Sequence, residues 1–389
     1  MAETSLQNAL LQIAKDQNFT APKIAIDESP NHGYIANVNR ITLKDSETDA
    51  TLHLFAKSKP KEIKGEWEFF YKNEAEFYNK VVAAFKEILQ NHGNKLTLPL
   101  MPKCYFANDE IVILEDLLET GYKIWSPLNE PLDKNHVKAV LSAYGKFHAF
   151  SFAFKHKYPE KFASIGYKFE WFQTNYERLI NNGFYKGLTE KLADCFDQET
   201  EFEYIEAIAN FLSHGQVAYL EKLALLSESD VFVHGDSWTH NYMFRYDVDE
   251  PKPKDVCILD FQIFRKTSPV IDLSYFISTC ACTPEFFNDI DVYLKVYHES
   301  LQTHLSQLNC PDVYTWDTLQ YEWRNYSLKG LIMAGIILKM MTADKDELEA
   351  RKHIEMPMQF DFISRNEALY QQRMRIVIKY FYDAGILQS

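Results

Sequence analysis

Two carboxylates and one amide form the set of side chains in this sequence best suited to chemistry. Asp236 and Asn241 lie five residues apart, and Asp260 follows a short apolar run. Phosphoryl transfer from ATP needs one carboxylate to receive the proton of the acceptor hydroxyl, and an amide oxygen with a second carboxylate to hold Mg²⁺. The three residues therefore predict an enzyme, a kinase for a small molecule, with ATP and Mg²⁺ as its cofactors.

Each of these residues also has a plainer interpretation. An Asp and an Asn in one turn commonly satisfy the local backbone, and an Asp after a strand commonly caps a helix. A metal site made of His234, Asp236 and His240 would lack the clear spacing and the fourth ligand of zinc sites. The order of Asp236, Asn241 and Asp260, each beside a strand-like run, favours the catalytic interpretation.

Short strand-like runs must position these side chains. Residues 231–233 precede Asp236, residues 242–245 follow Asn241, and residues 256–259 precede Asp260. Asp236 and Asn241 are therefore expected on a loop between two strands, and loops on a rigid scaffold are where catalytic groups concentrate. Gly235 permits a close approach that a side chain would block.

The remaining sequence divides into a β-rich part and a helical part. Up to residue 115, helical spacing covers 6–14 and 68–89, and strand-like runs cover 34–42, 51–57, 103–106 and 111–115. From about residue 133 helical patterns predominate, over 137–154, 202–226, 285–308 and 323–341. This order by itself predicts only the α+β class; together with the motifs it suggests a two-lobed, protein-kinase-like fold. Its small β-rich N-lobe is expected at 1–117 and its large, mainly helical C-lobe at 118–389.

The motifs carry a family resemblance. The strings VHGDSWTHN at 233–241, LDFQ at 259–262 and PVIDL at 269–273 resemble the signatures of aminoglycoside-phosphotransferase-like and choline-kinase-like enzymes. Within these, the chain most resembles the ecdysteroid-kinase-like (CHK-kinase-like) family, which is abundant in insects. The resemblance implies that Asp236 is the catalytic base, that Asn241 and Asp260 bind Mg²⁺, and that Asp272 braces the helical lobe. It extends from about residue 33 to residue 387.

The N-lobe should supply a lysine for the phosphates of ATP. Lys57 ends the apolar run 52–57, and the family pattern favours it over Lys59 and Lys61 as the contact of the α- and β-phosphates. The family's E-x-x-F-Y spacing selects Glu74 as the partner of this lysine. Glu76, on the same predicted helix, is the alternative.

The other nucleotide contacts are predicted from position in the family pattern. Gly33 and Asn37 occupy the place of the nucleotide-covering loop, and family members tend to carry Ser where Asn37 stands. Asn can still donate a hydrogen bond to a phosphate. Glu115 and Leu117 end the β-rich lobe, and their backbones are expected to form the hinge that offers adenine one acceptor and one donor.

Composition narrows the class of partner. The 389 residues carry a net charge of −14, which argues against broad binding of nucleic acid or anionic membranes. Six scattered cysteines are typical of reduced thiols in the cytosol. No secretory signal is visible, and the nine-residue apolar run at 330–338 is too short to span a bilayer. We expect a cytoplasmic protein, a monomer by default, with no nucleic-acid or membrane partner.

The resemblance also suggests the acceptor. It implies a flat, apolar polyol with a free hydroxyl, either an ecdysteroid or a plant metabolite in detoxification. Two alternatives stay open: a choline or ethanolamine kinase, which would bind a quaternary ammonium in an aromatic cage, and a kinase-like nucleotide-binding module without activity. A protein kinase is disfavoured because Gln262 stands where the glycine of Asp-Phe-Gly would be.

Overall fold

The computed structural model describes residues 2–27, 37–60, 68–90, 96–127, 129–166, 184–215, 219, 227–248, 250–351 and 362–387. The chain divides into two compact units. Unit 1 comprises Met1–Ile124, Lys157–Gly166 and Tyr242–Phe264, and unit 2 comprises Trp125–His156, Tyr167–Asn241 and Arg265–Ser389. The division into lobes at residue 117 stays a prediction.

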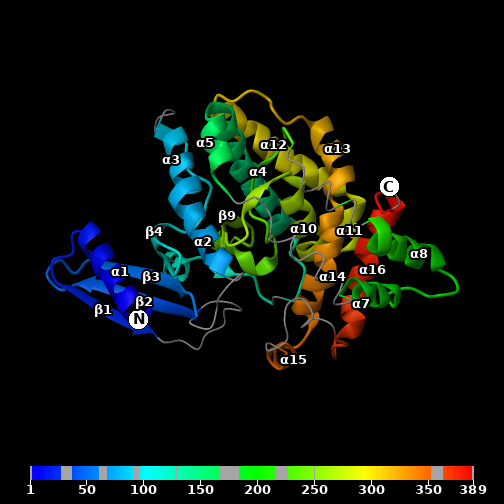
Figure 1. Ribbon diagram of the computed structural model, residues 1–389, viewed down its shortest axis with the longest axis horizontal. Helices are drawn as coiled ribbons and strands as arrows, with labels where there is room; N and C mark the ends of the chain where they lie inside the picture. The colour runs from blue at the N-terminus through cyan, green and yellow to red at the C-terminus, as the bar shows by residue number, and fades with distance from the viewer. Residues whose placement is uncertain are drawn as a thin grey trace. The chain divides into compact units, whose positions relative to one another are not determined.

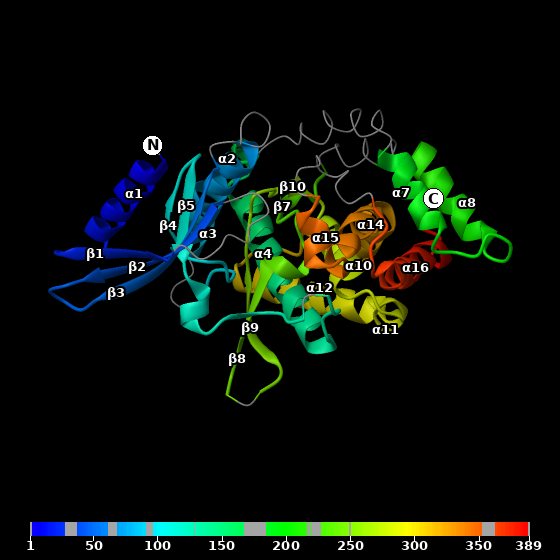
Figure 2. The same cartoon turned by 90° about the horizontal axis from the view of Figure 1, so that it is seen from below.

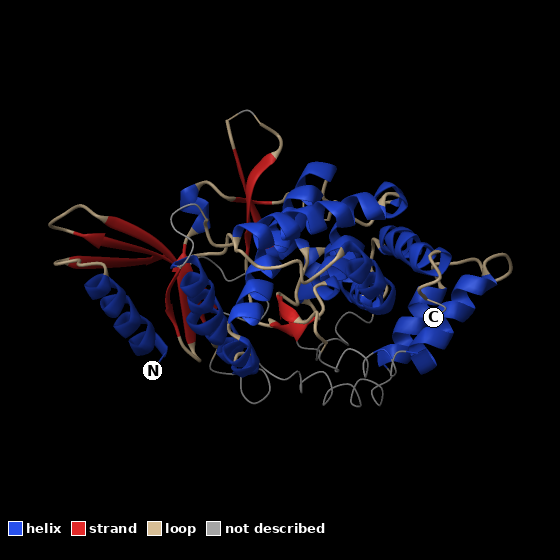
Figure 3. Ribbon diagram, turned by 90° about the horizontal axis from the view of Figure 1, so that it is seen from above, coloured by secondary structure: helices blue, strands red, loops and turns tan. Residues whose placement is uncertain are grey.

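An antiparallel sheet of five strands forms the centre of unit 1 (Figure 3). Its order is β1 (Pro22–Asp27), β2 (Asn37–Asp45), β3 (Thr51–Ser58), β5 (Ile111–Glu115) and β4 (Cys104–Ala107). One face is apolar and packs against helix α1 (Ala2–Asp16), whose Leu10 and Ile13 meet Leu43 and Leu54. Since side chains alternate along a strand, Arg40, Thr42, Phe55 and Lys57 lie on the opposite face.

The helix predicted over 68–89 is present but interrupted by one π-helical turn. It consists of α2 (Glu68–Glu76), the turn η2 (Phe77–Val81) and α3 (Val82–Gln90). Such a turn shifts the helix face that follows it and is frequent at functional sites. Here it begins three residues after Glu74, with the buried ring of Phe77.

Unit 1 also contains a second, three-stranded sheet in the order β6 (Lys123–Ile124), β8 (Tyr242–Tyr246) and β9 (Pro253–Ile258). Figure 2 shows β8 and β9 side by side. The turn η4 (Leu117–Thr120) leads into β6, and helix α5 (Pro159–Ser164) completes the unit. Leu117, Tyr122, Met243 and Cys257 form a small core between this sheet and the turn.

Unit 2 is mainly helical, with one two-stranded sheet of β7 (Val231–Val233) and β10 (Arg265–Thr267). Its helices and turns include α4 (Lys134–Lys157), α7 (Phe184–Ala193), α8 (Phe202–Asn210), η5 (Phe211–Gly215), η6 (Thr239–Asn241), α10 (Val270–Cys280), α11 (Pro284–Asn288), α12 (Ile290–Gln307), α13 (Trp316–Tyr326), α14 (Leu328–Thr342), α15 (Lys345–Glu349) and α16 (Glu367–Asp383).

Helix α10 lies at the centre of unit 2. Every residue from Val270 to Cys280 is buried, and Figure 1 shows α14 running beside it. The two helices approach closely because Gly330 of α14 has no side chain: a Cβ there would lie 2.3 Å from the carbonyl oxygen of Ser274. This close contact fixes α10 and the polar residues that it carries.

The predicted α+β class is confirmed, and most predicted helices are present. The helix predicted over 285–308 is divided at Asp289 into α11 and α12, and that over 323–341 is divided at Ser327 into α13 and α14. Part of the helix predicted over 202–226 lies outside the described residues. In the described parts of the chain, no helix combines the length and apolarity needed to cross a membrane.

Candidate active site

In unit 2, the loop that carries Asp236 is held by a buried carboxylate. It connects β7 to η6, and Gly235 within it has a φ of +88°, which favours glycine. The backbone N–H groups of His234 and Gly235 donate to Asp272 at 2.7 and 2.8 Å, and the Ser237 hydroxyl donates to it at 3.0 Å. Asp272 belongs to the first turn of α10. The loop is therefore tied to a helix whose residues are all buried.

A residue of a second helix also holds Asp272. His148 of α4 lies with its Nε2 3.2 Å from Asp272 Oδ2 and its Nδ1 3.1 Å from the Tyr297 hydroxyl. Burial raises the pKa of Asp272, but the hydrogen bonds from His148 and the loop backbone outweigh burial and hold that pKa below its ordinary value. His148 supports the loop through Asp272 without lying on it.

The carboxylate of Asp236 accepts hydrogen bonds on both oxygens. The hydroxyl of Tyr275 donates to Oδ1 at 2.9 Å. The indole of Trp238 donates to Oδ2 at 3.2 Å, and the Asn241 amide nitrogen donates to the same oxygen at 2.9 Å. These donors come from α10, the loop and η6, so the orientation of Asp236 depends on all three segments.

Asn241 suits the metal-binding role that was predicted for it. Its amide nitrogen donates to the carboxylate and the backbone carbonyl of Asp236, so its oxygen, the hard ligand that Mg²⁺ prefers, points away from that carboxylate. The alternative site made of His234, Asp236 and His240 is not formed. Within the described residues, no three His, Cys, Asp or Glu side chains are arranged to hold a metal.

In unit 1, Lys57, Glu74 and Asp260 form a connected charged cluster. The Lys57 ammonium donates to Glu74 at 2.8 and 3.1 Å and to Asp260 Oδ1 at 2.9 Å. The Glu74 side chain is fully buried, whereas that of Asp260 is 35% exposed. The alternative residue Glu76 binds Lys80 instead. The cluster thus has a buried end at Glu74 and an accessible carboxylate at Asp260.

In this cluster one ammonium group faces two carboxyl groups, so its charges balance only when one carboxyl is protonated. Burial lowers the pKa of Lys57, but the carboxylates of Asp260 and Glu74 outweigh it and leave the pKa above its ordinary value. Burial, reinforced by the nearby negative charge of Asp260, raises the pKa of Glu74 to about 7 despite the opposing effect of Lys57. With both carboxylates ionised, one negative charge is left over. Asp260 is the more exposed of the two carboxylates and thus the one that a ligand from solvent can reach.

Helix α2 holds the segment around Asp260 in place. Asp260 has a φ of +64°, a left-handed conformation that costs a non-glycine residue of the order of 1 kcal/mol. The buried amide of Asn73 donates to the carbonyls of Gln262 and Phe264, at 2.9 and 3.0 Å. The ring of Phe77 stacks on Phe261 with 3.6 Å between centroids. These contacts stabilise the conformation that directs Asp260 to Lys57.

The other predicted nucleotide contacts also belong to unit 1. Asn37 is exposed at the start of β2, and Gly33 lies outside the described residues. In the predicted hinge, the Glu115 N–H donates to the Lys103 carbonyl at 2.9 Å. The Leu117 carbonyl accepts hydrogen bonds from Thr120 and Tyr122. A purine could thus use the two other backbone groups, the Glu115 carbonyl and the Leu117 N–H.

Sequence reasoning missed two residues that support these clusters. Tyr275 lies three residues after Asp272 on α10, and residues at that spacing share a helix face. The predicted bracing role of Asp272 could have extended to it. Asn73 lies at the spacing of the apolar residues Phe70 and Phe77, and a polar residue within an apolar stripe indicates a buried hydrogen bond.

Comparison with known proteins supports the resemblance seen in the motifs. A sequence model of the Ecdysteroid kinase-like family matches residues 30–310, well over half of the chain. No curated protein matches the chain significantly. The family match confirms the predicted resemblance, and the two-lobed, protein-kinase-like α+β fold with it.

Solved structures of small-molecule kinases are similar at low identity. A choline kinase from Cryptosporidium parvum is 14% identical with a TM-score of 0.48, covering 99% of this chain and 98% of that chain. A microcompartment-associated aminopropanol kinase is 12% identical with a TM-score of 0.45, covering 97% and 98%. The GDP complex of aminoglycoside 2'-phosphotransferase-IIIa is 12% identical with a TM-score of 0.40, covering 86% and 97%.

Proposed function

Because the chain belongs to the ecdysteroid kinase-like family, we propose that it is an ATP-dependent small-molecule kinase. It would transfer the γ-phosphoryl group of ATP to a hydroxyl of an organic acceptor. The observation that carries this proposal is the buried ion pair of Lys57 and Glu74, joined by the carboxylate of Asp260. Kinases use a strand lysine, a helix glutamate and a metal-binding aspartate in this combination.

Each residue of the cluster then has a role in binding Mg²⁺-ATP. Lys57 contacts the α- and β-phosphates, and Glu74 fixes the direction of its ammonium group. Asp260 and Asn241 are the proposed ligands of Mg²⁺, which when bound neutralises part of the triphosphate charge. A cation bound at Asp260 would also satisfy the negative charge that Lys57 leaves unpaired.

The remaining nucleotide contacts come from the backbone and the β1–β2 connection. The Glu115 carbonyl and the Leu117 N–H are the proposed adenine contacts, because the Glu115 N–H and the Leu117 carbonyl are already hydrogen-bonded. Gly33 and Asn37 are proposed to cover the phosphates, which would fix the triphosphate relative to Lys57.

Asp236 is the proposed catalytic base. A fixed carboxylate can orient the acceptor hydroxyl and take up its proton as the oxygen bonds to the γ-phosphorus and the bond to ADP breaks. An alcohol is a poor nucleophile near neutral pH, so most of the rate enhancement would come from positioning and charge stabilisation. The hydrogen bonds that hold Asp236 on both oxygens support this role.

The proposed acceptor is an ecdysteroid or a plant polyol, so the biological role would be hormone inactivation or detoxification in an insect. This choice follows from the family alone. We propose further that the protein acts in the cytoplasm, as a monomer, without nucleic-acid or membrane partners.

A mass-spectrometric screen for phosphorylated products tests the proposed function. Wild-type protein and Asp236→Asn would be incubated with Mg²⁺-ATP and a panel of ecdysteroids, plant glycosides, choline and ethanolamine. The proposal predicts an ecdysteroid or glycoside heavier by one phosphate, at a rate roughly 10²–10⁴-fold lower in the variant. Phosphocholine as the sole product would favour the choline-kinase alternative. Bound ATP without any product would favour a module without activity.

A further inference from the structure

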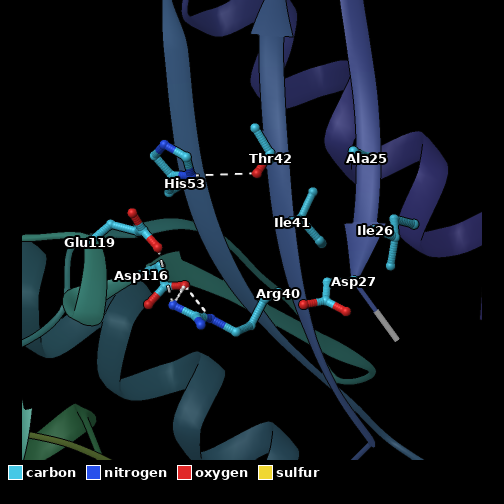
Figure 4. A pocket seen from close by; sticks show the side chains of 9 residues that line it. All are labelled: Ala25, Ile26, Asp27, Arg40, Ile41, Thr42, His53, Asp116 and Glu119. Atoms are coloured by element: carbon cyan, nitrogen blue, oxygen red, sulfur yellow. Dashed lines mark hydrogen bonds and ion pairs between the residues drawn. The ribbon is translucent and has the colours of Figure 1, made fainter. Parts of the chain in front are cut away.

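A polar hollow of about 350 Å³ opens on the sheet of unit 1. Six polar side chains from β1, β2, β3 and the segment after β5 line it: Asp27, Arg40, Thr42, His53, Asp116 and Glu119 (Figure 4). Its volume is near the lower end for small-molecule sites, so it suits a nucleoside better than a large polyol. Neither Arg40 nor the hollow has a role in the function proposed for this protein.

The hollow lies on the face of the sheet that carries Lys57. Arg40 is paired with Phe55, and Thr42 with His53, in the register of β2 and β3. Residues 53, 55 and 57 share one face, and two residues along a strand advance roughly 7 Å. A nucleotide with its phosphates at Lys57 could therefore place its nucleoside in the hollow, beside Asp116 of the predicted hinge.

The guanidinium group of Arg40 is fixed within this hollow. Its Nε donates to Asp116 Oδ2 at 2.6 Å, and a terminal nitrogen lies 3.4 Å from Glu119 Oε1. Asp116 is nearly buried, with a side chain 7% exposed, whereas the Arg40 side chain is 35% exposed. Since hydrogen bonds of a guanidinium lie in its plane, its edge is engaged and its faces stay available for stacking.

We infer that the hollow binds the purine nucleoside of ATP and that the guanidinium of Arg40 stacks on the base. The inference rests on the proposed function, because it assumes a nucleotide held by Lys57. Guanidinium groups stack favourably on aromatic rings and nucleobases. The ion pair with Asp116 holds the stacking surface in place before the nucleotide arrives.

The charges around the hollow also determine the direction of the nucleotide. Asp27 and Glu119 carry negative charge, and Arg40 is already paired with Asp116. A triphosphate would be repelled here, whereas a neutral base would not. The phosphates are therefore directed to Lys57 and the base to Arg40. A simpler explanation, in which the pair of Arg40 and Asp116 only ties β2 to the segment after β5, predicts no effect that depends on the base.

Calorimetric titration of the full-length protein distinguishes these explanations. Mg²⁺-ATP and Mg²⁺-triphosphate, which lacks the nucleoside, would be titrated into wild type, Arg40→Met and Arg40→Lys. Loss of a stacked cation weakens binding by roughly 3- to 30-fold. We expect Arg40→Met to bind Mg²⁺-ATP more weakly by this factor and to bind Mg²⁺-triphosphate with unchanged affinity. Arg40→Lys keeps the positive charge but lacks the planar guanidinium group. Its affinity for Mg²⁺-ATP should lie between those of wild type and Arg40→Met.

Arg245→Met is the matched control. Arg245 also belongs to unit 1, is 41% exposed and donates from Nε to a carboxylate, Asp255, at 2.9 Å, but it does not line the hollow. The Arg245→Met variant should bind Mg²⁺-ATP and Mg²⁺-triphosphate with the affinities of wild type. Unchanged ATP affinity in Arg40→Met would overturn the inference, as would an equal loss for ATP and triphosphate. A wild-type protein that does not bind Mg²⁺-ATP at all would overturn the proposed function first.

Discussion

At the scale of single residues, the structure shows which neighbours hold Asp236, the proposed catalytic base. Tyr275 is fully buried and donates to one oxygen, and Asn241 and Trp238 donate to the other. A proton acceptor must be oriented to within a fraction of an ångström of its target. We therefore propose that Tyr275 is a positioning residue for Asp236.

Tyr275→Phe tests this positioning role. The variant keeps the ring in the core and removes only the hydroxyl that donates to Asp236 Oδ1. We expect kcat for the phosphorylated acceptor to fall about 10-fold, because one hydrogen bond to a charged group is worth roughly 1.5–3 kcal/mol and only part of it bears on the rate. The KM for ATP should not change, since no nucleotide contact is altered.

Tyr370→Phe provides the control for this variant. Tyr370 is also fully buried in unit 2 and donates one hydrogen bond, to the Gly335 carbonyl at 3.0 Å. The Tyr370→Phe variant should lose about 1 kcal/mol in the free energy of unfolding and keep the kcat of wild type. If both variants lose the same share of kcat, the effect of Tyr275 is one of general stability and not of positioning.

At the scale of elements, strand β3 and helix α2 are joined by a carboxyl whose pKa is raised to about 7, chiefly by burial. Between its ordinary value of 4.5 and 7 the folded protein binds more protons at Glu74 than the unfolded chain. Its contribution to stability is therefore full below pH 4.5 and is lost as the pH rises towards 7.

Comparison of wild type with Glu74→Gln measures this contribution. The free energy of unfolding of both proteins would be determined at pH 5, 6, 7 and 8. We expect the value for wild type to fall relative to the variant between pH 5 and 7, by at most about 1.4 kcal/mol per pH unit. A relative value that rises with pH would mean that Lys57 lowers the pKa of Glu74 more than burial raises it.

The close approach of α10 and α14 at Gly330 should make this position sensitive to substitution. A Cβ at Gly330 would lie 2.3 Å from the backbone oxygen of Ser274, whereas one at Gly335 would lie 2.9 Å from the flexible end of Leu188. Gly330→Ala should cost about 1–3 kcal/mol in the free energy of unfolding. It should also lower activity, because α10 carries Asp272 and Tyr275.

Gly335→Ala is the matched control in the same helix. Its small clash can be relieved by a side-chain rotation, and alanine gains about 1 kcal/mol of helix propensity over glycine. We expect thermal unfolding close to that of wild type. If the two variants unfold at the same temperature, the close approach of α10 and α14 at Gly330 is not a constraint on the fold.

At the scale of the whole molecule, the sequence predicted the α+β class and most of the helices, because apolar spacing along long segments directly reflects their burial. The E-x-x-F-Y pattern of the family favoured Glu74 over the alternative Glu76. It could not predict that Asn73 reaches the carbonyls of Gln262 and Phe264, because that contact depends on a packing between segments almost 190 residues apart.

The hollow beside Arg40 was beyond sequence reasoning for a related reason. Arg40 and Asp116 are 76 residues apart, and only the strand register brings them together. From the sequence of its strand alone, Arg40 would be interpreted as an exposed surface charge. Tyr275, by contrast, could have been predicted from its spacing to Asp272. The sequence therefore predicts the helices and strands better than it predicts the contacts between them.

Calorimetric binding of ATP, with and without Mg²⁺, to wild type, Asp236→Asn and Asp260→Asn tests whether the protein is an ATP-dependent kinase without knowledge of the acceptor. We predict that wild type binds Mg²⁺-ATP, that Asp236→Asn keeps this affinity, and that Asp260→Asn loses most of the dependence on Mg²⁺. Absence of Mg²⁺-ATP binding by wild type would contradict the account, as would an Asp260→Asn variant as dependent on Mg²⁺ as wild type.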